Sequence, residues 1–219
     1  MAKKENFQEQ EQNLENFQNA LSSTESFIEK NQKLLSIILG VIIVVIAAWL
    51  LVQNLYIEPR EQEAAEMLSK GQELFAAENY EVALNGDSVD FDGLLYINEN
   101  YGLTKSGKLA AAYIGLSYYK LGDYDSAIEY LKDYSGKDAV LKYTVAGTIG
   151  DCYVQKGDAK SAINYFLDAA KADNMLIQPV YKVKAGLAYE SLGEYDKALK
   201  LYNEVKVDAS ASQRGIPEV

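Results

Sequence analysis

Few side chains in this sequence are suited to catalysis. The 219 residues include no histidine, which removes the commonest general base and the usual zinc ligand. Cys152 is the single cysteine, so no internal disulfide is possible, and without a histidine to activate its thiol we expect a buried, unreactive side chain. The sequence also has no phosphate-binding loop and no nucleophile constellation. We therefore predict a protein that is not an enzyme and that uses no cofactor.

One stretch resembles a calcium-binding loop. Ser88, Asp90, Asp92, Gly93 and Glu99 match positions one, three, five, six and twelve of an EF-hand loop. The first position is serine instead of aspartate, however, and no clear helix leads into the segment. Acidic residues beside glycine are also ordinary in loops. We interpret the stretch as a solvated loop between helices and predict no metal site.

The net charge of the chain limits the classes of molecule that it can bind. Acidic residues outnumber basic ones by 32 to 21, which gives a formal charge of −11. Nucleic-acid binding depends on basic residues that neutralise phosphates, and anionic lipid headgroups would repel so acidic a chain. We therefore expect protein partners, and neither a nucleic acid nor a small-molecule substrate.

A long apolar run predicts how the chain reaches a membrane. Residues 34–52 read LLSIILGVIIVVIAAWLLV and carry no charge. A helix of this length spans about 28 Å, which matches the hydrocarbon core of a bilayer. A cleaved signal peptide would start nearer the N-terminus and end at a small-residue cleavage site. We predict one transmembrane helix at 34–56, with Trp49 and Tyr56 near its downstream interface.

The charges beside this run predict its orientation. Lys30 and Lys33 precede it, whereas Arg60 on the far side stands among three glutamates. The positive-inside rule then places the N-terminus in the cytoplasm and the larger domain across the membrane.

The N-terminal segment, residues 1–33, is polar and rich in Gln, Asn and Glu. Apolar residues recur in it every seven positions and continue into the span: Phe7, Leu14, Leu21, Ile28 and Leu35. This spacing is typical of a short coiled coil or docking helix. Polar residues at the complementary positions leave open a loosely ordered tail.

The rest of the chain contains a repeated sequence pattern. Equivalent positions hold a small residue, a tyrosine, a turn glycine, a helix alanine and a large side chain. They are Gly115, Gly150 and Gly186; Tyr118, Tyr153 and Tyr189; Gly122, Gly157 and Gly193; Ala127, Ala162 and Ala198; and Leu131, Phe166 and Tyr202. Small residues let antiparallel helices approach closely, the second glycine makes a turn, and we expect the large residues to fill the space between hairpins.

The stretch YYKLGDYDSAIEY at 118–130 is close to the consensus of the tetratricopeptide repeat. We therefore predict an all-α fold, a single transmembrane helix followed by an α-solenoid of antiparallel helix pairs at 60–219. The predicted parts of this domain are a degenerate repeat at 61–84, an insertion at 85–107, and repeats at 108–142, 143–178 and 179–206. No closing polar-faced helix is recognisable, so either the chain continues past Val219 or another element caps the array.

Such arrays present the first helix of each pair on a concave surface. The alignment places there Leu109, Ala112, Leu116 and Tyr119; Thr144, Gly147, Asp151 and Val154; and Val180, Val183, Leu187 and Glu190. This predicted groove is apolar with a few acids and lacks Lys, Arg and Asn at these key positions, so we do not expect the class that grips acidic chaperone tails. It suits a hydrophobic segment or a partner helix. Alternatively, the insertion or a further helix of the chain fills it.

The sequence as a whole resembles the YfgM-like, TPR-containing ancillary subunits of the SecYEG translocon, in the form found in Bacteroidota. The resemblance rests on ESFIEKNQKLL before the span, on ENYEVALNGD with its insertion, and on the three repeats. It implies an inner-membrane anchor, a periplasmic repeat domain, and a role in passing exported proteins to periplasmic chaperones. A docking subunit of another cell-envelope assembly or secretion machine is the alternative.

Overall fold

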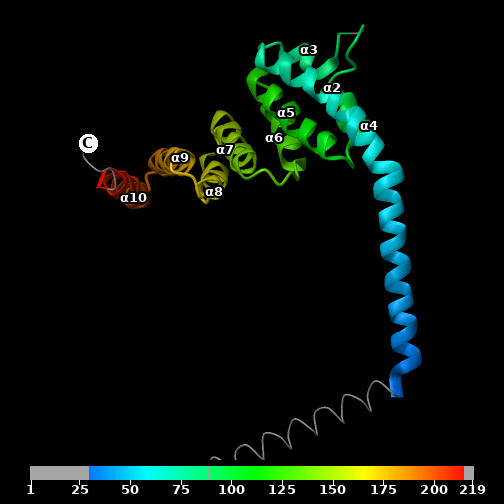
Figure 1. Cartoon of the computed structure of the whole chain (residues 1–219). Coiled ribbons are helices and arrows are strands. Elements are labelled where there is room, and N and C mark those ends of the chain that lie inside the picture. Colours follow the sequence, from blue (N-terminus) through cyan, green and yellow to red (C-terminus); the bar gives the residue numbers. More distant parts are fainter. Residues whose placement is uncertain (1–29, 88, 215–219) are drawn as a thin grey trace, which may run out of the picture. The chain divides into compact units, whose positions relative to one another are not determined.

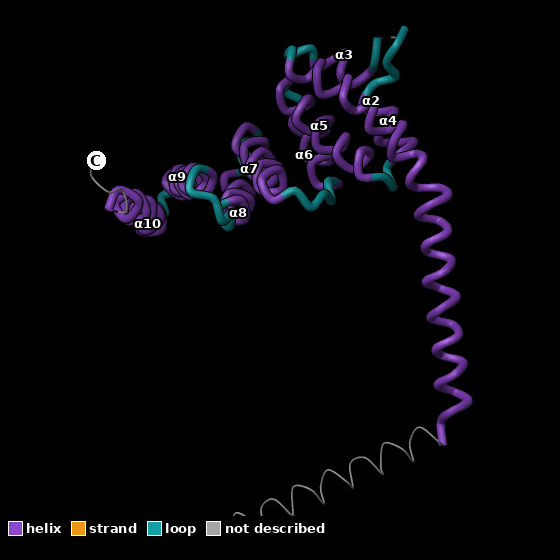
Figure 2. Tube along the Cα trace, in the orientation of Figure 1, coloured by secondary structure: helices purple, strands orange, loops and turns teal. Residues whose placement is uncertain are grey.

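The computed structural model describes residues 30–87 and 89–214, and every regular element in these ranges is a helix (Figure 2). The chain divides into two compact units, Met1–Tyr56 and Ile57–Val219. Figure 1 shows the succession of helices along the chain. The all-α prediction is confirmed. The predicted seven-residue repeat lies outside the described residues, except for Leu35.

The first unit contributes the apolar run. Residues 34–52 are helical, and each of them is exposed. They belong to a helix, Lys30–Ala76, that is the one helix in the described ranges long and apolar enough to cross a membrane, judged by length and composition. A π-helical turn, η1 (Gln53–Ile57), follows the run.

The second unit is a succession of helices joined by short connections. They are α2 (Glu58–Ala76), α3 (Tyr80–Asn85), α4 (Leu94–Tyr101), α5 (Lys105–Leu121), α6 (Tyr124–Asp133), α7 (Ala139–Gln155), α8 (Ala159–Ala169), α9 (Ile177–Ser191) and α10 (Tyr195–Arg214). The three hairpins α5–α6, α7–α8 and α9–α10 are repeats of one unit. Helix α7 also contacts α5 and α9, the first helices of the neighbouring hairpins.

The turns within the hairpins follow the repeat pattern. Gly122, Gly157 and Gly193 have φ angles of 84°, 77° and 74°, in the left-handed region that favours glycine. The next residue begins the second helix: Asp123 and Asp158 accept hydrogen bonds from the backbone N–H three positions on. In the first two hairpins a Gly–Asp pair therefore ends one helix and starts the next, and the glycine turns are those that the spacing predicted.

The glycines inside the first helices make close contact with the second helices. A Cβ on any of them would lie too close to a large side chain of its own hairpin. The pairs are Gly115 with Leu131, Gly150 with Phe166, and Gly186 with Tyr202. These contacts lie inside each hairpin, where the missing glycine side chain leaves room. The expectation that large residues also fill the space between hairpins holds for Leu131, which is buried in one cluster with Val145 and Ile149 of α7. Phe166 serves both purposes, since its ring also stacks on Tyr181 of the next hairpin at 6.4 Å.

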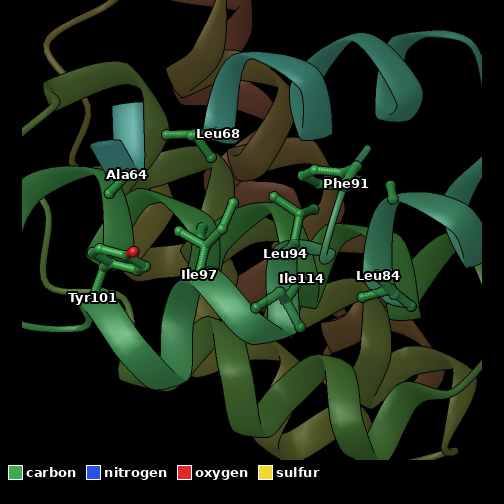
Figure 3. Close-up of a cluster of buried hydrophobic side chains, with 10 residues drawn as sticks. Ala64, Leu68, Leu84, Phe91, Leu94, Ile97, Tyr101 and Ile114 are labelled. Atoms are coloured by element: carbon green, nitrogen blue, oxygen red, sulfur yellow. The ribbon is translucent and has the colours of Figure 1, made fainter. Parts of the chain in front are cut away.

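The prediction of a solvated loop between α3 and α5 is wrong in part, because residues 94–101 of this segment form helix α4. Leu94, Ile97 and Tyr101 stand at helical spacing and are buried in a cluster with side chains of α2, α3 and α5 (Figure 3). Glu99 lies on this helix, so the EF-hand spacing does not form a loop. Among the described residues no group of three potential ligands could hold a metal ion.

Candidate peptide-binding groove

A pocket of about 550 Å³ opens between α7 and α9, with α8 behind it. We call it the α7–α9 pocket. Its lining residues are Asp151, Val154, Gly157, Ala159, Phe166, Lys184, Leu187, Ala188, Ser191 and Leu192. The pocket therefore joins two consecutive repeats, and three of the residues predicted for the groove line it.

Glycine at position 147 lets α7 and α9 approach each other. The ring of Tyr181 on α9 occupies the space where a Cβ on Gly147 would lie. Burial raises the pKa of the Tyr181 phenol, which stays neutral and packs as an apolar ring. The small residue on one first helix and the large residue on the next fix the spacing that produces the pocket.

The pocket contains a charge that the sequence interpretation missed. Lys184 on α9 pairs with Asp151 on α7, with Nζ and Oδ2 2.7 Å apart. The sequence interpretation excluded lysine only from the aligned groove positions, and Lys184, which is not one of them, lines the pocket as well. Lys184 stands four residues after Val180 and three before Leu187, so helical spacing places it on the same face. This spacing is the signal that could have found it.

The remaining accessible surface of the pocket is apolar. Val154, Leu187 and Leu192 are 46%, 55% and 46% exposed, although each carries a large hydrophobic side chain. Val180 and Val183 are also exposed on α9. An exposed apolar strip of this kind marks an interaction surface more often than it marks ordinary protein surface.

Other predicted groove residues lie elsewhere. Ala112 is fully buried among α5, α6 and α7, so its side chain is not available to a partner. Leu116 and Tyr119 are half-buried and pack against the same cluster. Leu109 packs against a different cluster, around α4 and α5.

Two polar positions of the predicted groove also lie outside the pocket lining. Thr144 is half-buried and donates its hydroxyl hydrogen bond to the carbonyl of Val140, 3.0 Å away. Glu190 is exposed near the end of α9. The pocket lining therefore brings together Asp151, Val154 and Leu187 of the predicted groove, whereas the other predicted residues lie outside this lining.

Comparison with known families identifies the repeated unit. The family model of the tetratricopeptide repeat matches residues 113–175 and 148–213, which together cover α5 to α10. These hairpins are tetratricopeptide repeats. The TPR hairpins carry the α7–α9 pocket, and TPR domains are scaffolds for interactions between proteins.

The fold is shared with solved structures. A crystal structure of MamA matches with a TM-score of 0.55 and 16% sequence identity, over 72% of this chain and 83% of that chain. At this identity the likeness extends to the TPR architecture alone. No curated protein matches the sequence.

Proposed function

We propose that this protein is a membrane-anchored TPR scaffold that binds apolar segments of other proteins in the α7–α9 pocket. The observation that carries the proposal is the exposure of Val154, Leu187 and Leu192 around one concave site. Complete burial of a fully exposed side chain of this kind is worth about 1.5–3 kcal/mol, and because these three are half-buried already, a partner gains roughly half of that from each. Covering all three side chains at once contributes favourably against the entropy that association costs.

The charges of the pocket favour an apolar partner over an acidic or basic one. Asp151 and Lys184 neutralise each other across the wall. A charged partner would have to break this pair to gain a new one, and the exchange brings little net free energy. An apolar partner leaves the pair intact and covers the exposed valine and leucines.

The setting that we propose is the bacterial inner membrane. The N-terminus lies in the cytoplasm, the helix containing residues 34–52 crosses the bilayer, and the TPR domain lies in the periplasm. The apolar run, the lysines before it and the resemblance to YfgM-like subunits support this arrangement. In this role the protein sits beside the Sec translocon and helps to pass emerging exported chains to periplasmic chaperones.

A second function is a docking subunit of another cell-envelope assembly or secretion machine. The exposed residues Val180, Val183 and Leu187 of α9 stand at helical spacing, which favours one partner helix packed along α9. The two functions differ in the number of partners and in the strength of binding. A chaperone adaptor binds many exported chains weakly, whereas a docking subunit binds one partner tightly.

The test uses Leu187→Asp, since Leu187 is exposed and its replacement leaves the core intact. The matched control is Leu103→Asp, at a leucine that is 73% exposed outside the pocket. In-cell crosslinking and purification in mild detergent, with mass spectrometry, identify the attached proteins. We expect Leu187→Asp to lose them and Leu103→Asp to keep them. Equal recovery with both variants would remove the pocket from the function.

The identity of the recovered proteins separates the two functions. SecYEG components together with varied exported chains would support the translocon role. One other envelope complex, recovered without translocon components, would support the docking role. Leu116 and Tyr119 are unsuitable for this experiment, because charges there would disturb the packing against the α5–α7 cluster.

A further inference from the structure

A second pocket, of about 560 Å³, lies between α6 and α8 over α7. Lys132, Lys137 and Lys142 surround it, and we call it the lysine pocket. We propose that the lysine pocket binds an acidic peptide segment that carries one apolar side chain between its carboxylates. This site is separate from the α7–α9 pocket and takes a ligand of the opposite character.

The lysines of this pocket form no ion pair within the part of the chain that the structure describes. Among the described residues, no carboxylate oxygen lies within ion-pair distance of Lys132, Lys137 or Lys142. Lys132 donates to the phenol oxygen of Tyr153 at 3.1 Å, and Lys142 lies over the ring of Tyr143. The chain carries 32 acidic residues, so three unpaired ammonium groups in one place are a distinctive local charge.

The acid at the edge of the pocket is already paired. Asp168 accepts a hydrogen bond from Lys171 at 2.8 Å. Asp138, beside Tyr134, is a second nearby acid, and its carboxylate accepts a hydrogen bond from the backbone N–H of Leu141. Lys132, Lys137, Lys142 and Lys171 outnumber these two acids, so the surroundings of the pocket keep a net positive charge. Carboxylates of a partner are the groups that complement it, through charge-assisted hydrogen bonds to the ammonium groups.

The basic character belongs to this cleft and not to the repeat. In the next hairpin, the residue equivalent to Lys132 is Leu167, and the residue equivalent to Lys142 is Gln178. The acidic residue at the edge of the pocket, Asp168, does have an acidic equivalent in the next hairpin, which is Glu204. The TPR fold therefore does not require lysine at these two positions. Lys132 also packs over the rings of Tyr153 and Tyr165, so it is the clustering of the three ammonium groups around one pocket that points to a binding site.

The walls of the pocket suit an apolar side chain. The half-buried rings of Tyr134 and Tyr165 line it, together with the aliphatic surface of α7. Tyrosine rings accept aliphatic and aromatic groups with little loss of conformational freedom. A segment with carboxylates on either side of a phenylalanine could place the ring between the tyrosines and the carboxylates against the lysines.

The overall charge of the chain selects a short peptide over an extended polyanion. At physiological ionic strength, charges interact over a Debye length of about 8 Å, so a short acidic segment senses mainly the lysines. A nucleic acid or an anionic membrane would extend beyond the pocket and meet the acidic surface of a chain with net charge −11. The proposed partner is therefore a protein with an acidic, phenylalanine-containing segment.

The test uses the full chain in mild detergent and a fluorescein-labelled peptide, Glu-Asp-Phe-Asp-Glu. Fluorescence anisotropy measures its affinity, with Gln-Asn-Phe-Asn-Gln as the neutral control. We expect the acidic peptide to bind at least about tenfold more tightly than the neutral one, and salt to weaken its binding. Replacing Lys137 and Lys142 together (K137Q/K142Q) should lower its affinity about fivefold or more. Lys160→Gln, at an exposed lysine of α8 outside the pocket, should leave the affinity unchanged.

Carbodiimide crosslinking of the bound peptide gives a second measurement, since it joins carboxylates to neighbouring lysines. Crosslinks should concentrate on Lys132, Lys137 and Lys142, and Leu187→Asp should leave them unchanged. Equal binding of both peptides, unchanged affinity in K137Q/K142Q, or equal displacement by inorganic phosphate and by the unlabelled peptide would overturn the proposal. None of these results bears on the α7–α9 pocket, so the two proposals fail independently.

Discussion

Lys184 on α9 donates hydrogen bonds to both carboxylate oxygens of Asp151 on α7, at 2.8 and 2.7 Å. The ammonium group also lies 5.7 Å from the ring centre of Phe166 and 5.6 Å from that of Tyr181. A single lysine thus joins the first helices of two consecutive repeats and forms part of the wall of the candidate groove. The same side chain therefore helps to hold two TPR hairpins together and to shape the candidate binding site.

We expect this ion pair to contribute more than the surface pairs do. The side chains of Asp151 and Lys184 are 23% and 36% exposed, so solvent screens their attraction only in part. A double-mutant cycle with Asp151→Asn and Lys184→Met, measured by urea unfolding, should give a coupling of about 1 kcal/mol. The same cycle on the more exposed pair Asp168 and Lys171 should give less than about 0.5 kcal/mol. Equal couplings would show that the position between repeats gives the pair no advantage.

Gly150→Ala should destabilise the second repeat. The added Cβ would lie 2.6 Å from the ring of Phe166, far inside contact distance. Overpacking of this kind costs about 1–3 kcal/mol. The free energy of unfolding in urea measures the loss. Adding Phe166→Leu to Gly150→Ala should recover part of it, because a smaller side chain makes room; additive losses would contradict the contact.

The carboxylate of Glu61 on α2 caps the first turn of α5. It accepts hydrogen bonds from the backbone N–H groups of Lys105 and Ser106, at 2.6 and 3.2 Å, and from the hydroxyl of Ser106 at 2.9 Å. Glu61→Ala should therefore lower the free energy of unfolding by about 1–2 kcal/mol, since the helix loses an acceptor and a favourable charge. The control is Glu66→Ala, at an exposed glutamate of the same helix, which should change it by less than about 0.5 kcal/mol.

Acid should weaken the connection between α3 and α4. Asp87 accepts backbone hydrogen bonds from Val89, Asp90 and Phe91. These bonds, the one from Asp90 above all, lower the pKa of Asp87 from 3.8 to about 2. A lowered pKa means that the stabilisation is complete above the unfolded value and disappears as the pH falls through the folded one.

The measurement that follows is urea unfolding at a series of pH values between 5 and 2, chosen to bracket these pKa values. The parent should lose stability over this range faster than Asp87→Asn, whose amide oxygen still accepts hydrogen bonds but does not titrate. Parallel curves for the two proteins would contradict the role of the Asp87 charge.

Cys152 should resist thiol reagents in the folded protein. Its side chain is fully buried, and burial raises its pKa to about 11, so the reactive thiolate is scarce at neutral pH. Iodoacetamide at pH 8 should label it slowly in buffer and completely in denaturant, with mass spectrometry as the readout. Rapid labelling under native conditions would indicate that α7 opens often.

The sequence alone was sufficient for the fold of the repeats. Gly122, Gly157 and Gly193 indicate turns, because few other residues adopt a left-handed backbone conformation. The regular spacing of these glycines identifies the hairpins. The buried state of Cys152 was also predicted, from its place on a repeat helix and from the absence of a histidine that could activate its thiol. Local rules of this kind depend on residues close in the chain, and a single sequence contains them.

Other features depend on contacts between helices that are distant in the sequence. Helix α4 escaped prediction because its three buried residues are too few to give a clear periodic signal, and only the surfaces of α2, α3 and α5 around them make the helix stable. The pairing of Lys184 with Asp151 and the exclusion of Ala112 from the groove required the packing of consecutive hairpins. The sequence therefore determined the helices of the repeats, whereas the tertiary structure decided that α4 forms and which faces stay open, because exposure is a property of what packs against a residue and not of the residue itself.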